Sequence, residues 1–393
     1  MSTAGSEAAQ SSQVRLRLHE SVSGIAADHW DALFAPGYPF IRHRFLKALE
    51  DSGCVGADSG WHPCHAVLED ASGSVMAAAP LYLKTHSYGE FVFDWSWAEA
   101  SQRMGRPYYP KLLCAIPFTP STGPRLGARD ESSRRQLMLA LSRLPPSLKA
   151  SSAHLLFSQH DDSQAALDAG ALLRKDIQFH WHNRGYRNFE DFVTQLRADK
   201  RKKLLRERRR IAEAGLRFEV VPGDQIAESF WSEIYALYAN TYEERGQPPY
   251  LNLAFFLDYG MHPGSPMRMI LCRDGARLVA CAVTIRGGDT LYGRHWGAAE
   301  HYHSLHFETC YYQGIDYCIR EGLTRYDAGA QGEHKLARGF EPCLTQSLHW
   351  LGQSRLSEAV DHFRRRERTL VETRQAELRQ HSPYRMDTEN SDG

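Results

Sequence analysis

The feature that most constrains this chain is a weak internal repeat, spaced by about 200 residues. Residues 65–84 read HAVLEDASGSVMAAAPLYLK, and residues 268–287 read RMILCRDGARLVACAVTIRG. Each segment consists of an apolar strand, a turn with an acidic residue and a glycine, and a second strand rich in Ala and Val. In both halves a strand, a helix and another strand follow. A repeat of this length indicates a duplicated domain, because solenoid repeats have periods of roughly 20–50 residues.

We therefore expect an α/β fold of the α+β mixed-sheet type, built from two tandem domains, each a mixed sheet with crossing helices. A chain of 393 residues is long enough for two such domains. The expected divisions are 1–13 as a disordered N-terminus, 14–185 as the first domain, 186–215 as a basic connecting helix, 216–353 as the second domain, and 354–393 as a C-terminal helix and tail.

Composition excludes several functional classes. Lys and Arg together number 47 and so do Asp and Glu, so a generally basic nucleic-acid binder is not expected, although a local patch stays open. The eight cysteines are scattered and form no C-x-x-C, which favours reduced thiols in a cytosolic protein. The start of the chain lacks the features of a secretory signal, and no apolar run is long enough to span a membrane. We expect a cytoplasmic protein with no membrane span; the oligomeric state stays open.

The densest run of polar residues is the segment 329–340, GAQGEHKLARGF, which follows a short predicted strand at 325–327. Loops at the carboxyl ends of strands are the usual ligand positions in open α/β sheets. We expect Glu333 or His334 to transfer protons, and Lys335 and Arg338 to hold an anion. Gln331 is a further candidate for ligand binding. A solvent-exposed turn is the alternative.

A second cluster, residues 291–308, combines an arginine, aromatic residues, histidines and Glu308. Arg294-x-x-Gly297-x-Ala299 fits the loose R-x-x-G-x-G/A pattern with which GNAT-type acetyltransferases hold a pyrophosphate. We therefore take Arg294, Trp296 and His306 as candidates for donor binding, with ordinary surface residues as the alternative. The histidines of this region do not have the spacing of known metal ligands, so no metal is expected.

Two further segments carry candidate binding residues. In the first half, polar and aromatic residues alternate near Lys84, Tyr88 and Asp94, which line either a cleft or an ordinary braced loop. The stretch 197–210, RADKRKKLLRERRR, contains nine Lys and Arg residues and two acidic residues. A solvated helix face is the default interpretation, and a phosphate-bearing or RNA partner is the alternative. The candidates for that partner are Lys200, Lys202, Lys203 and Arg206.

Taken together, these segments resemble a known family. The runs YLKTHSYGEFVFDW, YYPKLL, PFTPSTGPRL, LYGRHWG, HFETCYYQGIDYCI and GAQGEHKLARGFEP are similar to those of the Fem-like, peptidoglycan-biosynthesis-like predicted N-acyltransferases of bacteria. The resemblance covers about residues 36–385. It implies two GNAT-like domains in tandem and the transfer of an acyl or aminoacyl group to an amine. In Fem-type peptidyltransferases a helical pair is associated with aminoacyl-tRNA, whereas residues 189–214 supply one predicted helix here.

The resemblance implies an acyltransferase that acts by direct attack in a ternary complex. The amine attacks a thioester or ester carbonyl, so no acyl-enzyme is needed, and no G-x-S-x-G nucleophile pattern is present. Glu333 or His334 is the expected base, Glu308 a second candidate, and Tyr311 or Tyr312 the donor to the leaving group. Acyl-CoA is the expected co-substrate, tRNA the alternative, and no permanently bound cofactor is expected. Two other classes remain open: a non-catalytic Fem-like binding protein for a phosphorylated metabolite or cell-wall precursor, and an RNA-binding module.

Overall fold

The computed structural model describes residues 14–385, except residues 301, 331 and 353. The stretch 1–13, expected to be disordered, and the end of the expected tail lie outside these residues. The helices and strands of the first half are β1 (Arg15–His19), α1 (Ala27–Asp31), α2 (His43–Asp51), β2 (Trp61–Pro63), β3 (His65–Glu69), β4 (Val75–Ala79), β5 (Leu81–Lys84), α3 (Trp95–Arg103), β6 (Lys111–Cys114), β7 (Gly127–Ala128), α4 (Glu131–Arg143), β8 (Ser152–Leu156), α5 (His160–Asp168) and β9 (Leu172–His182).

The elements of the second half are α6 (Phe189–Thr194), α7 (Ala198–Glu213), β10 (Arg217–Pro222), α8 (Glu228–Glu243), α9 (Leu253–Phe255), β11 (Met267–Asp274), β12 (Arg277–Gly287), β13 (Thr290–Ala298), α10 (Leu305–Phe307), the π-helical turn η6 (Glu308–Tyr312), α11 (Gln313–Arg320), β14 (Arg325–Asp327), the 3₁₀ helix η7 (Glu333–Arg338), β15 (Glu341–Leu351) and α12 (Ser354–Gln380).

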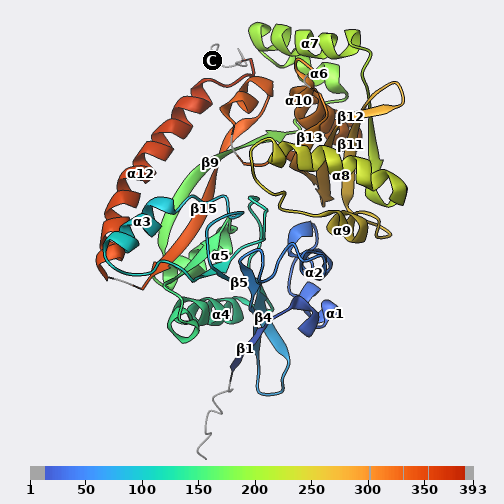
Figure 1. The fold of residues 1–393 in the computed structure, drawn as a ribbon. Helices are drawn as coiled ribbons and strands as arrows, with labels where there is room; N and C mark the ends of the chain where they lie inside the picture. The colour runs from blue at the N-terminus through green and yellow to red at the C-terminus, as the bar shows by residue number, and fades with distance from the viewer. Residues whose placement is uncertain (1–13, 301, 331, 353, 386–393) are drawn as a thin grey trace, which may run out of the picture.

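The two halves repeat one order of strand pairing, as the sequence predicts. In the second half β10, β11, β12 and β13 pair antiparallel in that order, and β13 then pairs parallel with β14 across the connecting α11. In the first half β1, β3 and β4 pair antiparallel, β5 continues to β6, and β6 pairs parallel with β8 across α4. The predicted strand–turn–strand units are therefore confirmed in both halves (Figure 1).

The second strand predicted within residues 65–84 is divided by Pro80. β4 belongs to a four-stranded sheet of order β1-β3-β4-β7, whereas β5 belongs to an 11-stranded sheet. Proline has no N–H to donate to a sheet, so the strand changes sheets at this residue. The equivalent strand in the second half, β12, has no proline and runs unbroken through eleven residues.

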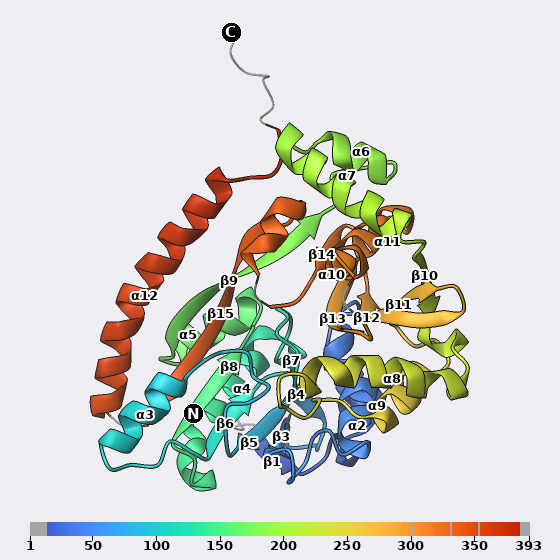
Figure 2. The ribbon, with the colours of Figure 1, turned by 45° about the horizontal axis from the view of Figure 1, so that its top comes forward.

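The halves exchange their last strands. The 11-stranded sheet has the order β10-β11-β12-β13-β14-β9-β15-β8-β6-β5-β2. Strand β9, the last strand of the first half, pairs with β14 of the second half, and β15, the last strand of the second half, pairs with β8 of the first half. The long β9–β15 ribbon thus joins both halves in one continuous sheet, and α12 lies along this ribbon (Figures 1 and 2).

The expected single helix at 189–214 is wrong in detail, because the structure has two helices there. Asn188 caps the start of α6, and its side chain accepts a hydrogen bond from the backbone N–H of Asp191. Between α6 and α7 the side chain of Leu196 is fully buried, and its backbone bridges to Tyr384. Burying Leu196 between the helices turns the chain, so α7 begins in a new direction.

Helices cover both faces of the second half. α8 packs on β12 and β13 on one face, and α6, α7 and α11 share a second apolar core on the other. The approach of α8 to β13 is close: a Cβ on Gly297 would lie 1.8 Å from the carbonyl oxygen of Leu237. Gly297 of the R-x-x-G-x-A match therefore serves helix packing, and Arg294 and Gly297 themselves lie within β13 rather than in a loop.

Candidate functional site

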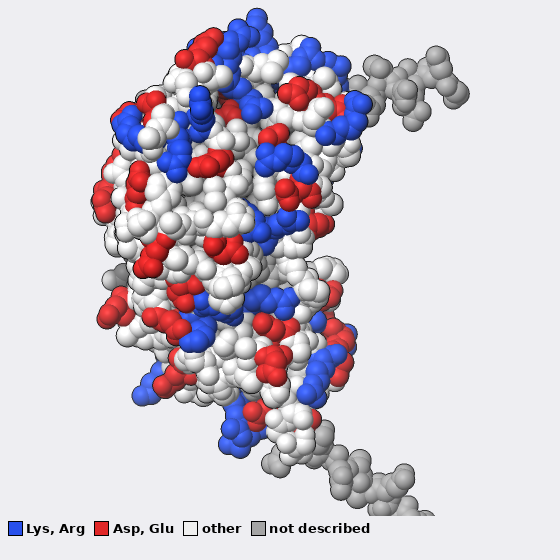
Figure 3. All heavy atoms as spheres, turned by 90° about the vertical axis from the view of Figure 1, so that its right-hand side faces the viewer, with Lys and Arg blue, Asp and Glu red and all other residues white. Residues whose placement is uncertain are grey.

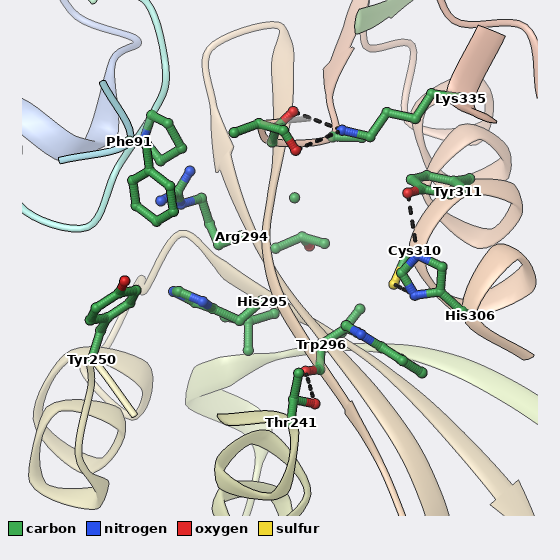
Figure 4. A pocket seen from close by; sticks show the side chains of 18 of the residues that line it. Phe91, Thr241, Tyr250, Arg294, His295, Trp296, His306, Cys310, Tyr311 and Lys335 are labelled. Atoms are coloured by element: carbon green, nitrogen blue, oxygen red, sulfur yellow. Dashed lines mark hydrogen bonds between the residues drawn. The ribbon is translucent and has the colours of Figure 1, made fainter. Parts of the chain in front are cut away.

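A cavity of about 380 Å³ opens where β13 and β14 diverge (Figure 4). Three residue pairs join these parallel strands, from Thr290 with Arg325 to Tyr292 with Asp327. Beyond Tyr292, β13 continues while the chain leaves β14 as the loop 328–330, and side chains of both segments line the gap. We call this cavity the wedge pocket.

The wall of the wedge pocket comes from both halves of the chain. Phe91 and Pro120 are contributed by first-half loops. The second-half residues that line it are Thr241, Tyr242, Arg245, Gln247, Tyr250, Ala282, Val283, Thr284, Gly293, Arg294, His295, Trp296, His306, Cys310, Tyr311, Tyr326, Ala328, Gly329, Ala330, His334 and Lys335. Phe91 and Phe118 have φ values of 60° and 55°, and Tyr250 stacks on Phe118 with ring centroids 5.0 Å apart. Such strained residues persist only where the surroundings hold them.

The charge of the pocket wall has one sign. Arg245, Arg294 and Lys335 are cationic, and none of the described residues that line the pocket is a carboxylate. Asp327 lies behind the wall, where its oxygens accept hydrogen bonds from the Ser121 hydroxyl (2.8 Å) and the Gly329 N–H (2.9 Å). Because the available charges are positive and partly desolvated, the pocket favours an anionic ligand.

Arg294 extends from β13 toward the first half. Its guanidinium donates a hydrogen bond to the carbonyl oxygen of Phe118, and Figure 4 shows it directed toward Phe91. Burial lowers the pKa of Arg294, and the nearby Asp327 opposes that shift. The side chain thus forms part of the contact between the halves as well as the pocket wall.

Lys335 is buried at the opposite side of the pocket. Its Nζ donates hydrogen bonds to the carbonyl oxygens of Gly329 (2.8 Å) and Ala330 (3.3 Å). Burial lowers the pKa of Lys335 to about 8, against an opposing contribution from Asp327. A fraction of the amine is therefore neutral in weakly alkaline solution.

A chain of hydrogen-bonding side chains leads out of the pocket. Cys310 Sγ lies 3.5 Å from His306 Nδ1, His306 Nε2 lies 3.3 Å from the Tyr311 hydroxyl, and that hydroxyl lies 2.9 Å from His334 Nε2. Burial, together with smaller contributions from the neighbouring His334, Arg338 and Lys335, lowers the pKa of His306 to about 4. His306 is thus a neutral imidazole at pH 7. Because His334 is solvent-exposed, the chain connects the pocket to water.

Six predicted site residues meet in the wedge pocket: Arg294, Trp296, His306, Tyr311, His334 and Lys335. Glu333 lies outside it and pairs with Arg374 of α12, with an N–O distance of 2.7 Å. Glu308 also lies outside: its Oε1 accepts hydrogen bonds from Gln313 (2.8 Å) and Arg208 (3.2 Å).

Arg338 is placed in a buried ion pair rather than in the pocket wall. Its guanidinium lies 2.9 Å from the carboxylate of Glu207 on α7 and 3.4 Å from the ring centroid of Phe307. Glu207 also accepts a hydrogen bond from Tyr312. These contacts fasten η7, which carries His334 and Lys335, to α7. Gln331 lies outside the described residues.

Of the first-half candidates, Lys84 and Asp94 lie in a buried charged cluster, whereas the Tyr88 side chain is exposed. Lys111 Nζ contacts the carboxylates of Glu90 (2.7 Å) and Asp94 (2.5 Å). Lys84 Nζ lies 3.3 Å from the carbonyl oxygen of Tyr88, and burial lowers its pKa to about 7. None of these side chains lines the wedge pocket. The cluster holds the loop 85–94, which places Phe91 in the pocket wall.

Several lining residues were missed at the sequence level, above all Arg245, Tyr250 and His295. The first two belong to the segment ERGQPPY, which follows the amphipathic α8. A Gly/Pro-rich loop with an arginine and a tyrosine after a long helix is a weak signal for a pocket rim.

Exposed cations of α7 lie beside the pocket. Lys202, Lys203, Arg206 and Arg209 are exposed and make no salt bridge with any described residue, and we call them the basic strip. Figure 3 shows Lys and Arg side chains at the top of the face it draws, which is the end of the molecule where Figure 1 labels α7. α7 packs against η7, which carries His334, so the strip lies near the pocket exit. Lys200, also predicted, pairs with Asp199 at 3.0 Å.

Among the described residues, no three His, Cys, Asp or Glu side chains are grouped so that they would hold a metal ion. In the same part of the chain, no helix combines the length and apolar character needed to cross a membrane.

Comparisons with known proteins agree with this architecture. The FemAB-like family model, described as peptidoglycan biosynthesis/recognition, matches residues 21–386. The solved structure of FemX is similar with 12% identity, covers 86% of this chain and 98% of its own, and has a TM-score of 0.52. The C-terminal domain (DUF2156) of a putative lysylphosphatidylglycerol synthetase from Agrobacterium fabrum has 11% identity, coverages of 86% and 95%, and a TM-score of 0.51.

A tandem GNAT protein from the clavulanic acid biosynthesis pathway has 12% identity, coverages of 87% and 99%, and a TM-score of 0.45. No curated protein sequence matches the chain. Identities this low establish the fold alone. The expected α/β fold of two similar mixed-sheet units in tandem is confirmed.

Proposed function

We propose that this chain, which belongs to the FemAB-like family, is an N-acyltransferase. It transfers an acyl or aminoacyl group from a phosphate-bearing donor to an amine, by direct attack of the amine on the donor carbonyl in a ternary complex. The observation that supports this most is the wedge pocket, whose wall combines cations and neutral imidazoles and, among its described residues, holds no carboxylate. Such a wall attracts an anionic donor and leaves a neutral base for the amine proton.

The pocket accounts for the reacting end of the donor. A volume of about 380 Å³ accommodates an acyl group with part of its carrier, so the rest of a large donor must lie outside. Beyond Tyr292 the edge of β13 that faces the pocket pairs with no described strand. The carbonyl oxygens of Trp296 and Ala298 accept hydrogen bonds from the Thr241 and Asn240 side chains, and the other backbone groups of this edge are available to an extended arm. Acyl-CoA has such an arm, and its phosphates would lie toward the basic strip.

The proposed chemistry uses the chain from His306 to His334. The amine must lose a proton as it attacks, and the neutral imidazole of His306 accepts it in the pocket. Tyr311 links His306 to the exposed His334, which returns the proton to water. An anionic donor bound beside His306 raises its pKa, because a nearby negative charge favours the imidazolium. Lys335 stabilises the negative charge that develops on the carbonyl oxygen. The bond from the carbonyl carbon to the carrier sulfur (or, in aminoacyl-tRNA, to the carrier oxygen) then breaks, and the carrier leaves as its thiol or alcohol with a proton from Tyr311, which Tyr311 regains from water through His334.

Aminoacyl-tRNA is the alternative donor, and the basic strip favours it. Four exposed cations on α7 offer a surface for backbone phosphates close to the pocket exit. A non-catalytic binding protein for a phosphorylated metabolite or cell-wall precursor would use the same cations without turnover.

One experiment separates these alternatives. Purified protein is incubated with a panel of amines and either acyl-CoA or aminoacyl-tRNA, and products are identified by mass spectrometry. Arg294→Gln and His306→Gln should abolish or strongly reduce product formation. Arg286→Gln is the matched control, because Arg286 lies on β12 and pairs with Glu321 away from the pocket. If a donor raises the unfolding temperature but no product forms, the chain is a binding protein and the proposal of an enzyme is wrong.

A further inference from the structure

A thiol and an imidazole lie side by side in the wedge pocket, and the proposed transfer to an amine makes no use of the thiol. Cys310 lines the pocket, and its Sγ lies 3.5 Å from His306 Nδ1. The two residues are four positions apart, in α10 and in the π-helical turn η6, so their side chains lie on one side of the helical segment. Figure 4 shows the sulfur atom beside the imidazole ring, within the group of side chains that surrounds the cavity.

This contact distinguishes Cys310 from the other cysteines of the chain. Five of the eight are buried, whereas Cys64, Cys310 and Cys343 are only partly buried. Neither Cys64 nor Cys343 lines the wedge pocket, and neither makes a hydrogen bond to an imidazole of the described residues. Burial raises the pKa of each of these two thiols to about 12. Cys64 and Cys343 are therefore matched controls, because they are similarly exposed thiols without a neighbouring base.

His306 is placed to take the proton of the Cys310 thiol. Its Nε2 lies 3.3 Å from the Tyr311 hydroxyl, and that hydroxyl lies 2.9 Å from His334 Nε2. When Nε2 of His306 carries the ring proton and donates it to the Tyr311 oxygen, Nδ1 is the free acceptor that faces Cys310. A nucleophile beside a base that a third group orients is the arrangement used in covalent catalysis.

The Cys310 thiol is neutral at rest and needs this base. Burial raises its pKa, and the positive charge of Lys335 opposes that shift to a smaller extent. Attack by the sulfur therefore requires His306 to remove the proton in the same step. A donor held in the pocket lies against the thiol, and Lys335 stabilises the negative charge that forms on its carbonyl oxygen.

We infer that Cys310 accepts the acyl group of a bound thioester or activated ester when no amine is present, and that water then hydrolyses the acyl-Cys310 thioester. The inference rests on the proposed function only in its premise that the wedge pocket holds an acyl donor. It adds a second activity, hydrolysis of the donor, to transfer to an amine. The amine and the thiol compete for one base, so a saturating amine should suppress the hydrolysis.

The atoms of the two steps balance. His306 Nδ1 takes the thiol proton while Cys310 Sγ forms a bond to the carbonyl carbon of the donor. The bond from that carbon to the carrier sulfur or oxygen breaks, and the carrier leaves as its thiol or alcohol with the proton that His306 held. A water molecule then attacks the acyl-Cys310 carbonyl and gives one proton to His306. The carbon–Sγ bond breaks, the carboxylic acid leaves, and the proton returns to Sγ.

Acylation of the full chain without an amine tests the inference. The wild type is incubated with p-nitrophenyl acetate or with acetyl-CoA and quenched in acid, and acetylated cysteines are located by peptide mass spectrometry. Cys310 should carry the acetyl group, while Cys64 and Cys343 in the same samples should not. p-Nitrophenyl acetate should also release a burst of about one nitrophenolate per chain, followed by slower steady hydrolysis.

Variants assign the reaction to the thiol and its base. Cys310→Ala should lose the burst. His306→Gln should lower the rate of acetylation at Cys310 by about tenfold or more, because the thiol no longer has a base. Cys64→Ser is the matched control and should give the wild-type burst and the wild-type label on Cys310. The peptide map of the wild type needs no variant, so it decides the question even if a substitution impairs folding.

Four results would overturn the inference. The first is the absence of an acetyl group on Cys310 with both reagents. The second is equal labelling of Cys310, Cys64 and Cys343, and the third is an unchanged labelling rate in His306→Gln. The fourth is a label that persists in water after the reagent is removed, which excludes the hydrolytic step.

The same samples separate this inference from the proposed transfer. Amine products without labelling of Cys310 would exclude the thiol and leave the transfer. Labelling of Cys310 without an amine product from any donor would exclude the transfer and leave the thiol.

Discussion

Replacing Lys335 by methionine should make the protein more stable near neutral pH while impairing the pocket. The ammonium group is buried, and its pKa falls from the ordinary 10.5 to about 8 in the folded chain. Methionine fills a similar volume and carries no charge. The substitution therefore removes the free-energy cost of holding an ammonium group in the pocket wall.

The magnitude and its sign follow from the two pKa values. Between the folded value near 8 and the unfolded value of 10.5, the unfolded state binds more protons, so wild-type stability rises with pH across this window. The ionisation cost of Lys335 is about 3 kcal/mol at about pH 7 and about 1.4 kcal/mol at about pH 9.5. The variant lacks this contribution, so its stability advantage should shrink by about 2 kcal/mol between these two pH values.

The assay is urea unfolding of both proteins, followed by tryptophan fluorescence at closely spaced pH values. Contributions of cysteines and tyrosines cancel in the difference between variant and wild type. Packing changes and the two lost hydrogen bonds shift that difference by a constant that does not vary with pH. A difference that stays flat from about pH 7 to about pH 9.5 would refute the argument that burial depresses the pKa of Lys335. Lys84→Met, at a second buried lysine outside the pocket, should show the same trend.

Three other substitutions have definite expected outcomes. Gly297→Ala should prevent stable folding or strongly lower the unfolding midpoint in calorimetry, because the new Cβ would lie 1.8 Å from the Leu237 carbonyl oxygen. Lys111→Met should cost about 3–5 kcal/mol in chemical unfolding, because it leaves two buried carboxylates without their cation; a loss below about 1 kcal/mol would contradict the buried ion pairs. Reversing three charges of the basic strip should weaken binding of CoA or tRNA and flatten its dependence on salt, as measured by fluorescence anisotropy. If the affinities for CoA and for tRNA are both unchanged, the basic strip is a solvated surface without a binding role.

The repeated strand pairs were predictable from the sequence because their signals are local. Alternation of side chains and the Asp-Gly turn at 274–275 depend on neighbours along the chain. The exchange of β9 and β15 between halves was not predictable. Pairing of β9 and β15 within their own halves would bury the same apolar strands as the exchanged pairing does. The sequence pattern is therefore identical for both arrangements.

The candidate site was predictable in part for the same reason. Lys335 and His334 follow the carboxyl end of β14, and that position alone identified them as candidate site residues. The placement of Glu333 depends on Arg374, 41 residues away on α12, and no local pattern predicts that pair. Phe91 and Tyr250 reach the pocket from segments far apart in the chain, so only the fold brings them together.

The central claim is that the wedge pocket carries out acyl transfer with His306 as the base. The most direct test is the single-turnover rate of transfer from donor to amine by the wild type, His306→Gln and Tyr311→Phe. The account predicts a rate lowered by about 10²–10⁴ in His306→Gln, a smaller loss in Tyr311→Phe, and unchanged unfolding midpoints for both. A wild-type rate in His306→Gln would contradict the account and locate the reaction elsewhere in the chain.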